Sequence, residues 1–137
     1  MEKITVTTTI KANLEKVWAY WTQPEHIIQW NFAAEEWCCP RATNELQSGG
    51  SFNWRMESKD GKMGFDFVGT YDKIIENELI TYKMPDGRQV DITFESTGEE
   101  VIVKEIFDPE QINPIDLQRN GWQAILENFK KHVESAV

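Results

Sequence analysis

The sequence predicts an α+β fold in which a curved antiparallel sheet wraps around a long C-terminal helix, with two short helices after the first strand. Three observations lead to this prediction. A strand with period-two alternation opens the chain, short alternating strands separated by brief turns fill its middle, and an apolar stripe at helical spacing ends it. We expect one domain covering residues 1–137, long enough to bury a core without disulfides or metals.

The opening segment predicts one strand and two helices. Every second residue over 4–10 faces one side of the predicted strand: Ile4, Val6, Thr8 and Ile10. Asn13 is a suitable N-cap for the helix that follows, whose apolar face has the expected spacing: Leu14, Val17, Trp18 and Trp21. Pro24 ends this helix and suits the first turn of a second one, which runs to about Trp30.

The middle of the chain predicts a meander of antiparallel strands. After a less regular stretch, Gly49-Gly50 precedes the first of five predicted strands: about 51–58, 65–75, 79–84, 88–96 and 101–107. The turns between them are short and rich in Gly, Asn, Asp and Pro, so consecutive strands should pair as hairpins. Gly69 lies among large residues and indicates a bulge or bend that curves the sheet.

The last segment predicts the longest helix. Asn113 is placed to cap it, Pro114 fits the first helical position, and an apolar stripe follows: Trp122, Ile125, Leu126, Phe129 and Val133. Gly121 costs about 1 kcal/mol of helix propensity relative to Ala, which suggests a close approach of its backbone to the sheet.

Charge and hydropathy exclude several classes of partner. The chain has 14 basic and 23 acidic residues and a net charge of −9, which repels phosphate backbones, so we expect no nucleic-acid partner. No apolar run approaches the roughly 20 residues that span a bilayer, and the N-terminus alternates instead of forming a signal-peptide core. We therefore expect no membrane insertion and a cytoplasmic location.

Catalytic and metal-binding motifs are missing from the sequence. The cysteines, Cys38 and Cys39, are adjacent, which is poor geometry for a structural disulfide, and we expect reduced thiols. His26 and His132 are far apart in the sequence, lack metal-ligand spacing and are expected at the surface or its boundary. We predict no catalytic residue, no metal and no other cofactor.

Sixteen aromatic residues in a chain of 137 are the strongest functional signal. Most lie on one face of a predicted strand or helix, and rings of this size facing a curved sheet are difficult to pack without leaving space. We therefore predict a ligand cavity between the sheet and the C-terminal helix, lined by Trp18, Trp21, Trp30, Phe52, Trp54, Met56, Phe65, Phe67, Tyr71, Phe94, Trp122, Ile125, Leu126 and Phe129.

Several segments resemble a known family. They are residues 13–18 after the opening strand, the 24–30 helix, Gly49–Phe52, Gly69–Tyr71, Val90–Glu95 and Gly121–Trp122. Their order and spacing resemble the START-like helix-grip superfamily, also called Bet v 1-like or SRPBCC. The most similar branch is related to the C-terminal domain of the activators of heat-shock-protein-90 ATPase. Residues 107–111 and 37–40 depart from the pattern of these relatives.

The resemblance implies a cavity that admits lipids, sterols, polyketides or other apolar molecules in many relatives. Three functions stay open: binding of a small apolar or amphipathic molecule, a protein-interaction module with a chaperone or other protein as partner, and a cyclase-like enzyme. We favour binding, by either a monomer or a homodimer. Candidate polar groups for such a wall are Tyr71, Tyr82, Asp66, Glu105, Arg55 and Arg88.

The interior of the protein distinguishes these three functions. A cavity of about 300 Å³ or more with a buried acid favours catalysis, an acid-free cavity favours binding, and a solid interior favours the interaction module.

Overall fold

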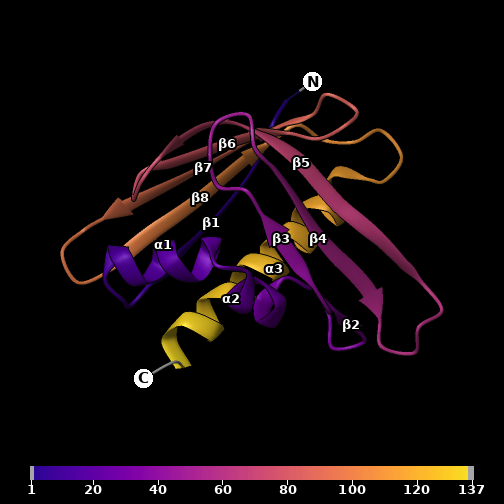
Figure 1. Ribbon diagram of the computed structural model, residues 1–137, viewed down its shortest axis with the longest axis horizontal. Helices are drawn as coiled ribbons and strands as arrows, with labels where there is room; N and C mark the ends of the chain where they lie inside the picture. The colour runs from indigo at the N-terminus through magenta and orange to yellow at the C-terminus, as the bar shows by residue number, and fades with distance from the viewer. Residues whose placement is uncertain (1, 136–137) are drawn as a thin grey trace.

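The computed structural model describes residues 2–135 and has the predicted α+β architecture (Figure 1). An eight-stranded antiparallel sheet curves around the long C-terminal helix, and two short helices follow the first strand. The elements in chain order are β1 (Ile4–Ile10), α1 (Leu14–Thr22), α2 (Pro24–Trp30), β2 (Trp37–Cys38), β3 (Ala42–Asn44), β4 (Ser51–Ser58), β5 (Gly64–Ile75), β6 (Leu79–Lys83), β7 (Gln89–Ser96), β8 (Val101–Phe107) and α3 (Ile115–Ser135).

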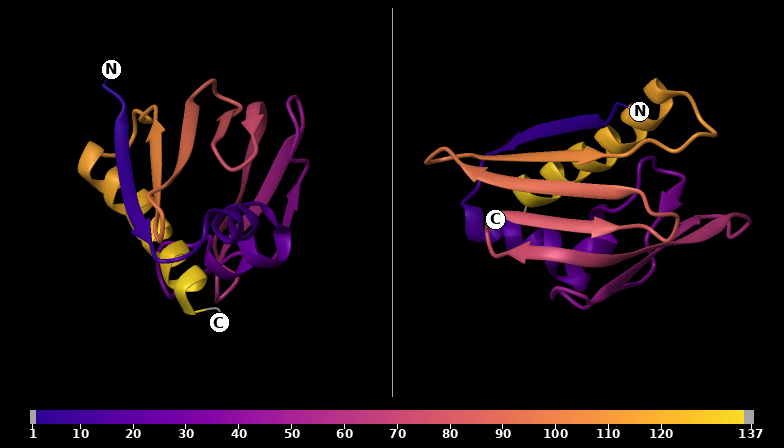
Figure 2. Two further views of the ribbon diagram at one scale, coloured as in Figure 1. Left: turned by 90° about the vertical axis from the view of Figure 1, so that its left-hand side faces the viewer. Right: turned by 90° about the horizontal axis from the view of Figure 1, so that it is seen from above.

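The strand order follows a meander closed by the first strand. It runs β1-β8-β7-β6-β5-β4-β2, and β3 also pairs with β4. β1 pairs with β8 in an unbroken antiparallel register from Ile4 opposite Phe107 to Ile10 opposite Val101. Views from two further directions show the sheet bent into an arch, with α3 along its inner side and α1 and α2 at one end (Figure 2).

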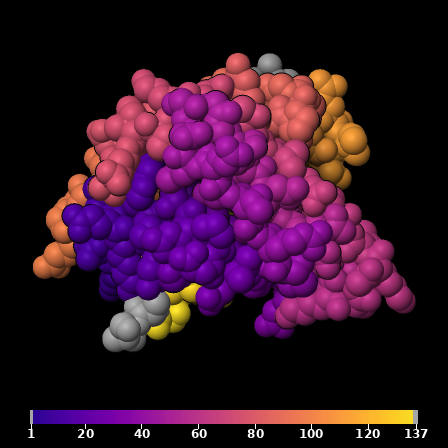
Figure 3. Space-filling model, in the orientation of Figure 1, coloured from indigo at the N-terminus to yellow at the C-terminus, as the bar shows by residue number. Residues whose placement is uncertain are grey.

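Two strands lie in the stretch that we predicted to be less regular. β2 and β3 have two and three residues and pair with opposite ends of β4. Strands this short show no periodicity, and their pairing with a distant strand decides where they form. The hairpin of β4 and β5 projects beyond them at the lower right of the space-filling view (Figure 3).

The bulge or bend predicted at Gly69 is not observed there. The register of β5 and β6 shifts farther along β5 instead, between Tyr71 and Lys73. Gly69 itself is regularly paired with Phe52. A Cβ atom at Gly69 would lie 2.5 Å from a ring carbon of Phe52. The glycine therefore makes room for a ring on the neighbouring strand.

Helix caps differ in how well they were predicted. The side chain of Asn13 accepts a hydrogen bond from the Lys16 amide at 2.8 Å and caps α1 as expected. α3 begins at Ile115, one residue later than predicted. Gln118 ties the preceding loop to the helix, since its side chain accepts from the Glu110 amide and donates to the Asn113 carbonyl.

The prediction for Gly121 was wrong. No atom lies within 4 Å of the place where its Cβ would be, so the backbone makes no close approach to the sheet there. The sheet packs against α3 farther along the helix, where the fully buried side chains lie: Leu126, Phe129 and Val133.

None of the helices within residues 2–135 is long and apolar enough to cross a membrane.

Candidate functional site

A cavity of about 440 Å³ lies between the inner face of the sheet and the helices α2 and α3. Its walls come from β4, β5, β6 and β8, from the turn between β6 and β7, and from all three helices, α1 contributing Trp21. Phe65, half exposed, lies at its edge with the exposed Asp66 and Asp86 side chains. The interior beneath the sheet is therefore hollow at this point.

Interlocking rings form one part of the cavity wall. Trp30 packs edge-on against Trp54 with 6.1 Å between ring centroids, and Phe67 approaches Trp122 edge-on at 6.3 Å. Trp122 also stacks on Phe107, with the rings 3.8 Å apart and nearly parallel. Edge-to-face and stacked pairs add to the stability of buried rings, so this part of the wall is well fixed.

The structure divides the predicted lining residues into two groups. The first lines the cavity: Trp21, Trp30, Trp54, Met56, Phe65, Phe67, Trp122 and Ile125. The second is packed in the core and does not line this cavity: Trp18, Phe52, Tyr71, Phe94, Leu126 and Phe129. Trp18 and Phe94, for example, contact each other edge-on at 5.1 Å and pack within the core.

Further lining residues come from positions that the aromatic stripes do not mark. These are Asn31, Asp66, Val68, Tyr82, Met84, Pro85, Asp86, Arg88 and Glu105. Tyr82 and Met84 continue the alternation of buried residues that begins at Ile80 in β6, so a longer period-two search would have found Met84. Asn31 follows α2 directly, and no pattern in the sequence marks it.

Glu105 is the most unusual polar group in the cavity. It lies on the inward face of β8 between Val103 and Phe107 and is 4% exposed. Within residues 2–135 no hydrogen bond or ion pair joins its carboxyl group to another side chain. Burial raises the pKa of Glu105 from its usual 4.5 to about 8, because it removes hydration from the charged form. At neutral pH the carboxyl group is therefore mainly protonated.

Two further donors lie in the cavity wall. Tyr82 is 2% exposed, and burial, followed by the charge of Glu105, raises the pKa of its hydroxyl well above the usual value. Trp54 is also buried, and its indole Nε1 has no hydrogen-bond partner. An unpartnered buried donor is costly, so both groups suit a ligand that brings an acceptor.

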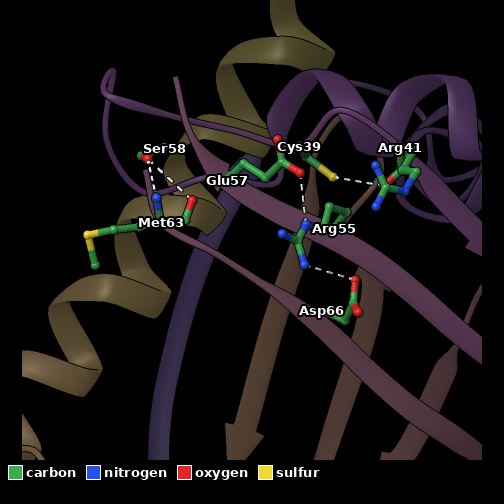
Figure 4. Close-up of polar contacts among 7 residues, drawn as sticks. All are labelled: Cys39, Arg41, Arg55, Glu57, Ser58, Met63 and Asp66. Carbon is green, nitrogen blue, oxygen red and sulfur yellow. Dashed lines mark hydrogen bonds and ion pairs between the residues drawn. The ribbon is translucent and has the colours of Figure 1, made fainter. Parts of the chain in front are cut away.

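The charged groups at the edge of the cavity are paired. Arg88 donates to Asp86 at 2.7 Å. On the outer face of the β4–β5 hairpin, Arg55 donates to Glu57 and approaches Asp66 at 3.5 Å (Figure 4). Arg55 does not line the cavity, and its charge is matched by its neighbours on the two strands.

The β4–β5 turn and Cys39 have local partners, which Figure 4 also shows. The Ser58 hydroxyl accepts from the Met63 amide and closes the β4–β5 turn. Both cysteines are free thiols, as expected, and Cys39 is buried with its sulfur 3.6 Å from the Arg41 carbonyl. Burial raises the pKa of the Cys39 thiol, so it is not activated as a nucleophile.

The two histidines, distant in the sequence, meet in the fold. Nδ1 of His26 lies 3.0 Å from Nε2 of His132, and the Tyr20 ring stacks on His26. Burial, followed by the charges of His26 and Lys16, lowers the pKa of His132. Neither histidine lines the cavity, and residues 2–135 contain no cluster of three side chains able to hold a metal ion.

The comparison with protein families matches residues 11–134 to a family described as activator of Hsp90 ATPase homolog 1-like protein. The comparison with curated proteins found no match.

Solved structures agree with this match. The chain is 37% identical to an AHSA1-like protein from Aeromonas hydrophila, with a TM-score of 0.89 and coverage of 97% of this chain and 94% of that one. It is 50% identical to a protein from Cytophaga hutchinsonii, with a TM-score of 0.84 and coverage of 97% and 92%. A protein of the dynemicin biosynthetic locus shares the fold at 14% identity and a TM-score of 0.75, over 98% of this chain and 48% of that one.

The family match covers nearly the whole chain, and these relatives have the same helix-grip arrangement of sheet and terminal helix. The chain therefore belongs to the activator of Hsp90 ATPase homolog 1-like family, within the START-like superfamily that its sequence resembles.

Proposed function

We propose that this protein binds a small, uncharged amphipathic molecule in the cavity. The apolar body of the ligand packs against the aromatic wall, and a carbonyl or hydroxyl oxygen accepts a hydrogen bond near Glu105. One observation supports this proposal above the others: a buried carboxyl group without a hydrogen-bonding or charged partner among residues 2–135 faces a mainly apolar cavity.

The energetics of Glu105 favour a ligand. A carboxyl group buried without a hydrogen bond destabilises a fold, and its neighbours on the same face of β8 are apolar: Val101, Val103 and Phe107. A ligand oxygen would restore the missing hydrogen bond. Because Glu105 is protonated at neutral pH, it acts as a donor, as do the Tyr82 hydroxyl and the Trp54 indole.

The charges around the cavity favour a neutral ligand. Among residues 2–135, Arg88 is the one basic side chain in the wall, and it is already paired with Asp86, so it offers little to an anion. A cation would need to bind ionised Glu105, which burial disfavours.

Native mass spectrometry of protein purified from its own source tests this proposal, together with tryptophan fluorescence during titration with uncharged apolar probes. We expect a co-purifying molecule and a change in emission, because Trp54 and Trp122 line the site. Glu105→Leu should weaken binding of a carbonyl-bearing probe by about two- to tenfold, the worth of one hydrogen bond. Glu105→Gln keeps a donor and should bind nearly as well.

The matched control is Glu95→Gln, the same chemical change at an exposed position of β7. Its affinity should equal that of the wild type. Unchanged emission across the whole panel of probes would contradict ligand binding.

A second candidate is proton-transfer catalysis, which Glu105 also supports. A buried carboxyl group with a pKa of about 8 is suited to exchange protons near neutral pH, and the cavity exceeds the size at which we expected a buried acid to indicate chemistry. Deuterium incorporation next to the carbonyl of a bound ketone, lost in Glu105→Gln, would favour this candidate. A ketone that gains no deuterium after long incubation would contradict catalysis and leave ligand binding as the proposed function.

A chaperone-partner role, which the family name suggests, stays a prediction. It was expected to accompany a solid interior, whereas a cavity of about 440 Å³ with a buried acid was expected to accompany catalysis. Addition of the purified protein to an Hsp90 ATPase assay would test it directly.

A further inference from the structure

A second hollow lies beside the cavity. It has a volume of about 320 Å³ and runs between the β4–β5 hairpin and the N-terminal half of α3, which passes behind these strands in Figure 1. We call it the α3 groove. Four side chains line both spaces: Met56, Phe65, Trp122 and Ile125. The groove is therefore separated from the cavity by a single layer of side chains.

This dividing layer contains movable members. Trp122 is held by its stack on Phe107, but Phe65 is half exposed, and Met56 has a flexible unbranched side chain. Exposed side chains change rotamer within nanoseconds, so Phe65 can move aside without any movement of the backbone, whereas Met56 is buried.

The chemistry of the α3 groove is uniform. Within the described part of the chain, no charged side chain lines it, and its walls are mainly apolar, with Trp37 on one side and Leu117 on the other. Leu117 is 58% exposed although it is a large apolar residue at the outer end of the groove. An occupant of this space must be apolar and reach solvent at that end.

The absence of a side chain at Gly121 leaves space in the groove. It lies inside α3, where glycine weakens a helix relative to alanine. Packing does not require it, because no atom lies within 4 Å of a Cβ built at this position. Gly121 does line the groove, so any larger side chain there would occupy the open space.

We propose that the cavity and the α3 groove form one elongated site, and that the ligand is a long-chain molecule with a single polar end. Its polar end lies near Glu105, and its apolar tail passes between Phe65 and Trp122 and continues over Gly121. This inference rests on the proposed function and adds the shape and class of the ligand.

A homologous series of uncharged 1-alkanols tests the inference, with hexanol, decanol and tetradecanol titrated into the full chain and followed by tryptophan fluorescence. For the wild type we expect affinity to rise about fourfold for each added methylene until the groove is filled. Gly121→Leu places a side chain in the groove and should stop this rise early. Tetradecanol should then bind more than about tenfold more weakly than to the wild type, and hexanol within about twofold.

Asn120→Leu is the matched control, because it adds the same side chain one residue away, at an exposed position of α3 that does not line the groove. It should bind all three alkanols like the wild type, and circular dichroism should show both variants folded. Equal tetradecanol affinity of Gly121→Leu and the wild type would overturn the inference while the proposed function survives. Absence of hexanol binding to the wild type would overturn both.

Discussion

Glu105 shows how far a single residue can be interpreted from the sequence. The alternation of β8 places it on the same face as Val103 and Phe107, and it was one of the carboxylates offered for the cavity. Its lack of a partner depends on which side chains of β6, β7 and α3 surround it, and these come from distant parts of the chain. Asp66, the other candidate, is half exposed at the cavity edge.

Glu105→Gln should change the pH dependence of stability. The pKa of the carboxyl group is raised from 4.5 to about 8 in the folded state, so the folded protein binds more protons than the unfolded chain between these values. Its contribution to the free energy of unfolding is therefore greatest below pH 4.5 and declines as the pH rises toward 8. The glutamine variant does not titrate and should gain stability over the wild type across this range, by up to about 5 kcal/mol.

Urea unfolding at pH 5 and pH 8.5 measures this difference. Glu95→Gln, on the exposed end of β7, should show no comparable change between the two pH values. A constant difference between Glu105→Gln and the wild type would indicate that the carboxyl group is hydrated in the folded protein.

The elements differ in how well the sequence predicts them. β1, β4, β8 and α1 were predicted to within about one residue, because each has a clear period of burial. β5 was predicted equally well, although its burial pattern is less regular. β2 and β3 were missed since they exist only through pairing with β4. Gly69 and Gly121 show the limit of interpreting glycines: each was assigned the wrong local cause, because the relevant neighbours lie on other elements.

The two glycines predict opposite effects of the same substitution. Gly69→Ala brings a methyl group into the Phe52 ring and should destabilise the protein by about 1–3 kcal/mol. Gly121→Ala meets open space within a helix and should stabilise it by about 0.5–1 kcal/mol. Thermal unfolding of both variants under one condition measures the contrast. A stabilised Gly69→Ala would show that Phe52 is free to move aside.

At the scale of the whole molecule, the fold was predictable and the cavity only in part. Ring-bearing positions such as Trp54 and Trp122 follow from alternation and helical spacing. Whether a ring faces a space or fills it depends on the curvature of the sheet, which brings Trp18 against Phe94 and leaves Trp30 beside open volume. No local pattern encodes that curvature.

The sheet also predicts how protection against hydrogen exchange is distributed. β8 lies between β1 and β7 and carries three fully buried side chains, so its amides should exchange only through global unfolding. β2 has two residues at the end of the sheet and should exchange much faster through local opening. Hydrogen-exchange mass spectrometry of the full chain gives both rates. Equal protection of β2 and β8 would mean that the sheet opens as one unit.

The pairing of β1 with β8 has a consequence for synthesis of the chain. On the ribosome, β1 emerges well before its partner β8, which is made about a hundred residues later and is followed by α3. The tryptophans of the inner face therefore stay uncovered on the nascent chain until β8 and α3 have also emerged. During that interval the unfinished protein is prone to self-association, and its safe completion depends on speed of translation or on capture by a folding helper.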